Sequence, residues 1–217
     1  MLGLNEIVNL TSSISVFSAF PSSGQDSQSL RFNFWNHRVA TAIIAKYMAR
    51  KFDLPTSGQE FVGGLLHDIG KIILDEYFHE DFVKAHDLAL SRGQELITAE
   101  REVLGTDHAE VGALLADRWR LPTYLKDVIG FHHNPARATA KEATAVVSIA
   151  NLLAQGLELG CGGASPSFVL SEQEGWQLLK ELGHPMDDID IERLTFELGD
   201  MRQEVASYIG SLGSQEA

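Results

Sequence analysis

Residues 61–74 read FVGGLLHDIGKIIL, an apolar run with one histidine–aspartate pair inside it. The apolar spacing predicts a helix that closes near this pair, and we expect Gly70 to interrupt that helix. Adjacent residues on a helix point about 100° apart, so His67 and Asp68 can face one ion only near a helix end. A carboxylate among leucines and isoleucines is costly to bury unless a cation or hydrogen bonds compensate it. The stretch therefore indicates a helical core with a candidate metal site.

Further histidines stand in an ordered set along the chain. His37 lies mid-helix among apolar neighbours, His108 starts a helix, and His132 and His133 end another. Imidazole and carboxylate together suit one or two divalent ions, of Fe, Mn, Zn, Ni or Mg. A single histidine on an apolar face is more often a core residue than a ligand, and a structural role suits the three in polar stretches, His79, His86 and His184.

Helical signals dominate the rest of the chain, and the sequence contains neither an internal repeat nor a convincing strand pair. We expect helices at about 30–52, 57–66, 79–92, 94–104, 107–119, 122–131 and 142–157. The pairs Ser57 with Glu60, Asp107 with Glu110 and Ser171 with Glu174 are interpreted as helix N-termini, the first and third as capping boxes. An all-α fold follows.

The region after Gly160 differs in composition. Residues 160–168 read GCGGASPSF, a linker of small residues, and amphipathic helices are predicted at about 172–182 and 187–210. We interpret residues 158–217 as a helical C-terminal extension packed on a main bundle of residues 1–157.

Composition and charge exclude several classes of protein. The chain has 217 residues, of which 44% are hydrophobic, which is enough for a sizeable globular core. Its net charge of −13, without a local Lys/Arg cluster, disfavours binding to nucleic acids. No apolar run is long enough to span a membrane, and the start does not read as a secretion signal. The single cysteine, Cys161, fits a reducing cytoplasm.

Several strings of the sequence together resemble a known family. HDIGK, residues 67–71, with a helical histidine upstream, is similar to the HD superfamily of metal-dependent phosphohydrolases. The strings LGLNEIVNL, WNHRVATAIIA, FVGGLLHDIGKIIL, DHAEVGALLADRWRLP, IGFHH and VVSIANLLA extend the resemblance to the HDOD family over about residues 1–155. The resemblance implies an HD-domain-like helical bundle with a role in bacterial signalling. It also implies that a helical N-terminal lobe, which family members carry before the LGLNE stretch, is missing here.

The resemblance assigns roles position by position. His37 matches the first metal-binding histidine, His67 and Asp68 match the doublet, and Lys71 matches a lysine that often faces substrate phosphate. Asp68 and Lys71 would be the catalytic residues if the chain is active. The remaining metal positions, three histidines of the binuclear HD-GYP relatives and a late aspartate, correspond to His108, His132, His133 and Asn151.

Three departures from the family pattern argue against catalysis. Asn151 offers only a neutral carbonyl oxygen where the pattern has a carboxylate. Asn33 stands one helical turn before His37, where binuclear relatives often carry Glu, and NPARATAKEA stands where they have a GYP string. A cyclic-dinucleotide phosphodiesterase of the HD-GYP type is therefore disfavoured.

Three classes of function stay open. The favoured one is a regulatory module on a metal-binding scaffold that binds a signalling protein or a small phosphate-bearing effector. The second is a metal-dependent phosphohydrolase acting on a nucleotide or phosphoester, with metal-activated water and with Lys71 neutralising phosphate charge. The third is a structural interaction domain whose histidines are core residues.

The first twenty residues predict an interface. Their apolar side chains would lack cover if no lobe precedes them, namely Leu4, Ile7, Val8, Leu10, Ile14 and Phe17. Large exposed apolar patches usually mark interfaces. We expect partial cover by the C-terminal extension together with a homodimer.

Overall fold

The computed structural model describes residues 25–159, 168–200 and 205. These residues form helices and no strands, which confirms the predicted all-α bundle with a helical C-terminal extension. The α-helices are α2 (Gln25–Lys51), α3 (Gln59–Leu66), α4 (Ile69–Tyr77), α5 (His79–Arg92), α6 (Leu96–Leu104), α7 (His108–Arg118), α8 (Thr123–Phe131), α9 (Lys141–Gly156), α10 (Glu174–Glu181) and α11 (Ile191–Asp200). Short 3₁₀ turns are η1 (Pro135–Arg137), η2 (Leu170–Glu172) and η3 (Met186–Asp188). Among these helices, none is both long and apolar enough to cross a membrane.

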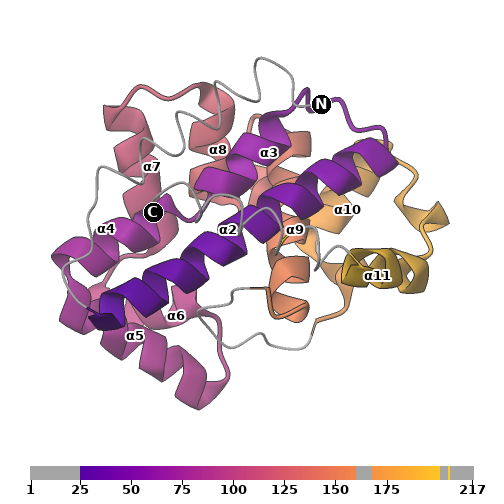
Figure 1. Ribbon diagram of the computed structural model, residues 1–217. Coiled ribbons are helices and arrows are strands. Elements are labelled where there is room, and N and C mark those ends of the chain that lie inside the picture. The colour runs from indigo at the N-terminus through magenta and orange to yellow at the C-terminus, as the bar shows by residue number, and fades with distance from the viewer. Residues whose placement is uncertain (1–24, 160–167, 201–204, 206–217) are drawn as a thin grey trace, which may run out of the picture.

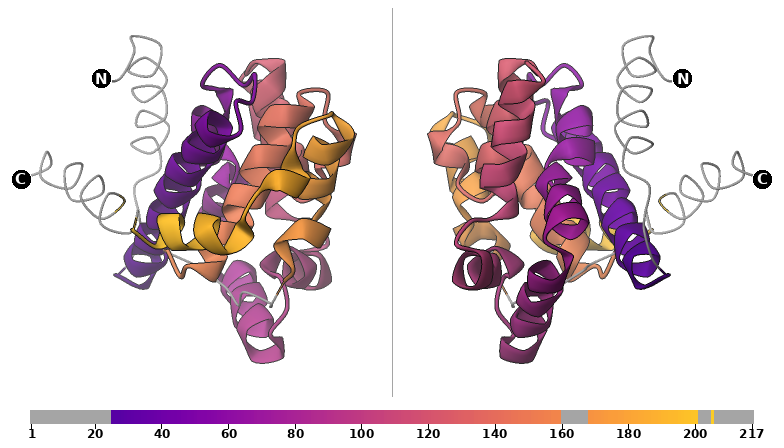
Figure 2. Two further views of the ribbon diagram at one scale, coloured as in Figure 1. Left: turned by 90° about the vertical axis from the view of Figure 1, so that its right-hand side faces the viewer. Right: turned by 90° about the vertical axis from the view of Figure 1, so that its left-hand side faces the viewer.

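The long helix α2 runs through the middle of the molecule, and α3 and α9 pack along it (Figure 1). On one side of α2, α4 packs on α7, α7 packs on α8, and α5 pairs with α6. The two side views place α7 and α8 at the upper end of the bundle and the α5–α6 pair at its lower end (Figure 2). Helices far apart in the chain therefore share one interior.

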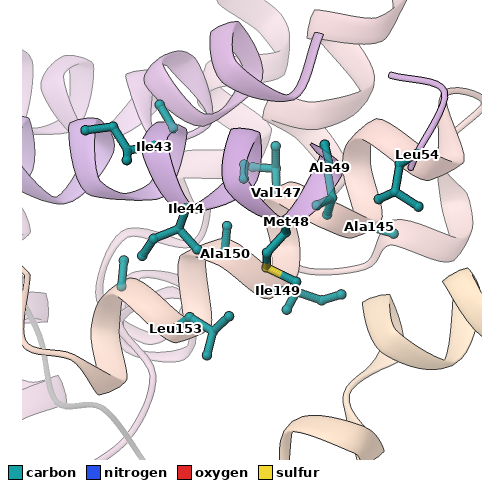
Figure 3. Packing of buried hydrophobic residues seen from close by; sticks show 14 of the residues in the cluster. Ile43, Ile44, Met48, Ala49, Leu54, Ala145, Val147, Ile149, Ala150 and Leu153 are labelled. Carbon is teal, nitrogen blue, oxygen red and sulfur yellow. The ribbon is translucent and has the colours of Figure 1, made fainter. Parts of the chain in front are cut away.

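The main core forms where α2 meets α9. Ile44 and Met48 of α2 and Ile149 and Leu153 of α9 belong to one buried cluster (Figure 3). Every residue of α9 from 143 to 151 is buried, and a helix that is buried all round belongs inside a fold rather than on its surface. The last residue of this stretch is Asn151, so α9 carries a polar side chain into the interior.

The C-terminal helices complete that same core. Trp176 and Leu179 of α10 and Leu194 and Leu198 of α11 join the cluster of α2 and α9, and α10 packs directly on α9. The helix expected over 187–210 instead begins at Ile191, after the turn η3. The apolar segment predicted over residues 4–17, its expected dimer contact and Cys161 lie outside the described residues.

Both predicted capping boxes are wrong, whereas the predicted helix start at Asp107 is confirmed. Helix α3 begins after Gly58 and α10 begins after Gln173, in neither case with a side-chain cap. Neither serine occupies the N-cap position. Ser57 lies in a left-handed turn with φ 53°, and Ser171 is part of the 3₁₀ turn η2. Asp107, in contrast, accepts a hydrogen bond from the backbone N–H of Glu110 at 2.9 Å, as an N-cap should.

Gly70 has a different role from the predicted one. Helix α3 ends at Leu66 and α4 begins at Ile69, so the break lies at His67 and Asp68 and Gly70 is inside α4. A Cβ atom on Gly70 would lie 1.9 Å from the carbonyl oxygen of His108. Glycine is therefore required because α4 and the start of α7 touch backbone to backbone, which brings His108 beside Asp68.

Candidate metal centre

All seven residues predicted as metal ligands come together in the interior of the bundle. The buried six come from α2, the α3–α4 junction, the start of α7, the end of α8 and α9: His37, His67, Asp68, His108, His132 and Asn151. The seventh, His133, is half-buried beside His132. The sequence order of these residues therefore corresponds to a real cluster in space.

The ligand atoms divide into two groups with Asp68 between them. Oδ2 of Asp68 lies 3.2 Å from Nε2 of His67, and Oδ1 lies 3.3 Å from Nε2 of His108. Within each group every residue offers a ligand atom within 4.8 Å of the other two, and the groups are His37–His67–Asp68 and His108–His132–His133. One carboxylate thus faces both sets of imidazoles.

Asp68 is also paired with a cation of the chain. Nζ of Lys71 donates to Oδ2 of Asp68 at 2.6 Å, and the lysine is itself buried. Burial alone would raise the pKa of Asp68, but His67, Lys71 and His108 outweigh it and hold that pKa well below its usual range. The centre therefore contains a permanently charged carboxylate at neutral pH.

Three rings are oriented by oxygen atoms behind them. Nδ1 of His67 lies 2.8 Å from the carbonyl oxygen of Gly64, and Nδ1 of His132 lies 3.1 Å from those of Val128 and Ile129. A carbonyl oxygen only accepts, so each Nδ1 carries a hydrogen, and Nε2 is the nitrogen that each ring turns toward the centre. Burial lowers the pKa of His132 well below its usual range, which keeps that ring neutral.

The third ring, of His108, is held by a carboxylate that was not predicted from the sequence. Oε2 of Glu100 lies 2.6 Å from Nδ1 of His108 and accepts from its backbone N–H at 2.9 Å. Carboxylate–histidine pairs of this kind usually orient metal ligands. A signal was present, because Glu100 falls three and four residues after Ile97 and Leu96 on the buried face of α6.

His37 is engaged differently from the other rings. Its Nε2 lies 2.8 Å from Oδ1 of Asn151, and the same oxygen accepts from Nε2 of Gln155 at 3.1 Å. The amide oxygen therefore takes the Nε2 hydrogen of His37. Burial lowers the pKa of His37 to about 3, so the ring stays neutral. The nitrogen that faces the centre is thus used in a hydrogen bond.

The comparison with known families agrees with this geometry. The family model of the HDOD domain matches residues 1–135, which is more than half of the chain. The chain belongs to the HDOD family. The match includes the two histidine groups, and it ends before α9, which carries Asn151.

Relatives of this HDOD chain support the fold more than a function. An uncharacterized protein of Treponema pallidum (strain Nichols) is 27% identical over 154 residues, which cover 70% of this chain and 29% of that protein. The chain therefore spans less than a third of this curated relative's length.

Solved structures share the architecture. An HDOD domain protein of unknown function from Geobacter sulfurreducens is 24% identical with a TM-score of 0.79, covering 96% of this chain and 71% of that one. A proposed phosphohydrolase from Shewanella amazonensis SB2B (23% identity, TM-score 0.63, 91% and 68% covered) and a proposed signal transduction protein from Marinobacter aquaeolei VT8 (22%, 0.70, 97% and 45%) are also similar. At these identities the likeness shows the fold alone.

A small cavity lies against the centre of this HDOD domain. Its volume is about 80 Å³, and it is lined by three residues of the cluster and by side chains of α9, of the loop before α6 and of the start of α10: His132, His133, Asn151, Ser148, Leu152, Glu95, Gln173 and Glu174. The C-terminal extension therefore supplies part of the wall beside the histidines.

The residues present fit a divalent ion. Oδ1 of Asp68 is fully buried and has no hydrogen-bond partner among the described residues, and the same holds for Nε2 of His67. Buried acceptor atoms without a donor are costly, and a cation would satisfy them. Neutral imidazoles with a carboxylate are a donor set typical of Zn, Fe, Mn or Ni sites.

Proposed function

We propose that this HDOD domain is a bacterial regulatory module in signal transduction, and that its histidine–aspartate centre binds a divalent metal with little or no catalysis. The single observation that carries the proposal is the small space at the centre. The cavity of about 80 Å³ is far below the ~300–1,000 Å³ of sites that enclose small-molecule ligands. A cavity of this size, formed by the described residues, does not enclose a nucleotide.

The ligand set also supports a regulatory role. Asn151 stands where an anionic ligand would help to hold a metal and position its water, and it contributes only a neutral oxygen. The Nζ atom of Lys71, which would have to face a substrate phosphate, donates instead to Asp68 at 2.6 Å. We propose a signalling protein or a small phosphate-bearing effector as the partner, and the cytoplasm as the location.

The second candidate is a metal-dependent phosphohydrolase acting on a nucleotide or phosphoester. It is favoured by the retained set of five histidines with Asp68 and by a buried lysine at the centre. A bound divalent ion would supply Lewis-acid chemistry for such a reaction. In that case Asp68 would hold the metal, and Lys71 would have to leave Asp68 to contact the phosphate.

A turnover assay separates the two candidates. The full chain, saturated in turn with Zn²⁺, Mn²⁺ and Fe²⁺, is incubated with nucleoside mono-, di- and triphosphates, cyclic dinucleotides and a chromogenic phosphoester. We expect rates no higher than those of His67→Ala, which removes a central ring. Turnover that clearly exceeds this background, and that His67→Ala abolishes while His79→Ala retains it, would establish the hydrolase instead. His79 suits as the control because it bonds to Asp75 and belongs to neither histidine group.

A binding assay tests the regulatory part of the proposal. The same phosphates are titrated into the metal-loaded chain, and backbone hydrogen exchange is followed along the helices. A regulatory effector is expected to change the exchange rates of helices on the molecular surface without being consumed. If no phosphate changes exchange anywhere, the effector class is wrong, and the protein partner remains as the proposal.

A further inference from the structure

The two oxygens of Asp68 have unequal surroundings. Oδ2 accepts a hydrogen bond from Nζ of Lys71 at 2.6 Å and has His67 beside it. Oδ1 is buried and has no donor among the described residues, although it lies 3.3 Å from Nε2 of His108 and 3.6 Å from Nε2 of His132. One oxygen of the carboxylate therefore has a hydrogen-bond donor, and the other, on what we call the unsatisfied side, has none among the described residues.

Four separations between ligand atoms on the unsatisfied side are close to those of a coordination shell. Nε2 of His108 lies 3.1 Å from Nε2 of His133 and 3.4 Å from Nε2 of His132. Bonds of ~2.0–2.1 Å in a tetrahedral zinc site separate neighbouring ligand atoms by ~3.3–3.4 Å. The two separations between nitrogens are within ~0.3 Å of that spacing, and so are the distances from Oδ1 of Asp68 to Nε2 of His108 and of His132.

The contact between His108 and His132 suits two ligands of one ion. The Nδ1 atoms of both rings face acceptor oxygens, of Glu100 and of the α8 backbone. With the hydrogen of a neutral ring on Nδ1, the lone pair of Nε2 is available to a metal. A cation among these atoms would attract both Nε2 lone pairs and Oδ1 of Asp68.

The other side of Asp68 lacks these features. Nε2 of His37 is held by Asn151 at 2.8 Å, so this ring must break a buried hydrogen bond before it can bind a metal. Lys71 already supplies positive charge at Oδ2. Lys71 and the buried Arg38 already place positive charge near Asp68. Each divalent ion adds two more positive charges to this interior, so a second ion without a further anionic ligand is strongly disfavoured.

We propose that a single divalent ion binds on the Oδ1 side of Asp68, held by His108, His132, His133 and that oxygen, and that Lys71 occupies the Oδ2 side in place of a second ion. This inference rests on the metal binding in the proposed function and specifies where the ion lies. It narrows the sequence-based expectation, in which all seven residues together hold one or two ions. In this chain His37 and His67 lie on the Oδ2 side of Asp68, where Lys71 supplies the positive charge.

The test uses Co²⁺ as a spectroscopic probe on the metal-free full chain. We expect one equivalent by calorimetric titration, with the intense visible absorption of a four-coordinate cobalt site. His133→Ala, which changes the most exposed ligand, is expected to lower Co²⁺ affinity at least tenfold and to weaken that absorption. His37→Ala is expected to leave stoichiometry and spectrum unchanged, with affinity within about threefold. His79→Ala serves as the control for an unrelated histidine.

A complementary pair of changes tests why the second ion is absent. Lys71→Met with Asn151→Asp removes the competing ammonium and adds a carboxylate, so a second equivalent of Co²⁺ is expected. Anomalous diffraction from wild-type crystals grown with Co²⁺ locates the ion even if a variant fails to fold.

The outcomes distinguish where the ion binds from whether any ion binds. Two equivalents in the wild type, an ion located between His37 and His67, or binding lost in His37→Ala but kept in His133→Ala would overturn the placement and leave metal binding intact. A wild type that binds no Co²⁺ or Zn²⁺ would overturn both. Phosphoester turnover with one ion at the three histidines would overturn only the proposed regulatory role.

Discussion

Replacing Gly70 with alanine tests how the centre is assembled. The added Cβ would lie 1.9 Å from the carbonyl oxygen of His108 and 2.9 Å from the backbone nitrogen of Gly112. Carbon atoms pack at ~3.5–4.0 Å, so α4 and α7 would have to separate by more than ~1 Å. Forced separation of packed elements costs ~1–3 kcal/mol, whereas alanine gains up to ~1 kcal/mol over glycine in a helix.

The clash should dominate, because both contacting atoms are backbone and cannot rotate away. We expect Gly70→Ala to lose ~1–3 kcal/mol of unfolding free energy, which corresponds to a fall in Tm of roughly 2–12 °C for a chain of this size. Because the shift moves His108 relative to Asp68, Co²⁺ affinity should fall as well. Thermal unfolding with and without metal, together with calorimetric titration, measures both effects.

Gly199→Ala is the matched control. Gly199 also lies in a helix, α11, but a Cβ there meets no atom within 4 Å among the described residues, so this change should be neutral or stabilising by up to ~1 kcal/mol. A Gly70→Ala protein with wild-type Tm and metal affinity would refute the close contact of α4 and α7. Equal destabilisation by both changes would refute the steric reasoning.

Three further outcomes are expected. Glu100→Gln should keep the helical fold by circular dichroism but weaken Zn²⁺ binding ~10–100-fold in a competition titration, and unchanged affinity would show that the carboxylate does not orient His108. Asn151→Asp should slow the loss of bound metal to a chelator, since it adds an anionic oxygen, and faster loss would contradict this. The metal-free protein should lose stability as the pH falls from ~6.5 to 4.5. His37 has a pKa of about 3 in the folded chain and ~6.5 in the unfolded chain, so unfolding takes up a proton in this range. The free energy of unfolding should therefore be lower by up to about 2–3 kcal/mol at pH 4.5. Denaturant melts across this range measure it, and His37→Gln should flatten the dependence.

Local patterns predicted the helices well where the chain itself provides the signal. The helix at 79–92 ends at Gly93, which adopts the left-handed conformation expected of a C-terminal cap, and Asp107 caps α7. The short helix α4 was missed, because its apolar run continues that of α3 and Gly70 reads as a breaker. Its glycine is explained only by a neighbour that lies far along the chain.

The ordered histidines predicted the cluster, but the pairing within it depends on contacts that sequence spacing does not reveal. Spacing does not reveal that Lys71, for which the resemblance implies a phosphate contact, donates to Asp68. It does not reveal either that Asn151, predicted as a ligand, accepts a hydrogen bond from His37. Another such contact joins Asp127 of α8 to the backbone N–H groups of Thr139 and Ala140, both at 2.8 Å, just before α9. Each depends on where two helices lie relative to each other.

The position of α9 has a practical consequence for anyone who trims this chain to its recognised family segment. A fragment that stops at residue 135 would omit α9, the helix that is buried from 143 to 151 and that fills the space behind α2. Ile44, Met48 and their neighbours on α2 would then face solvent, and His37 would lose Asn151. The smallest autonomous folding unit is therefore larger than the segment by which the family is recognised.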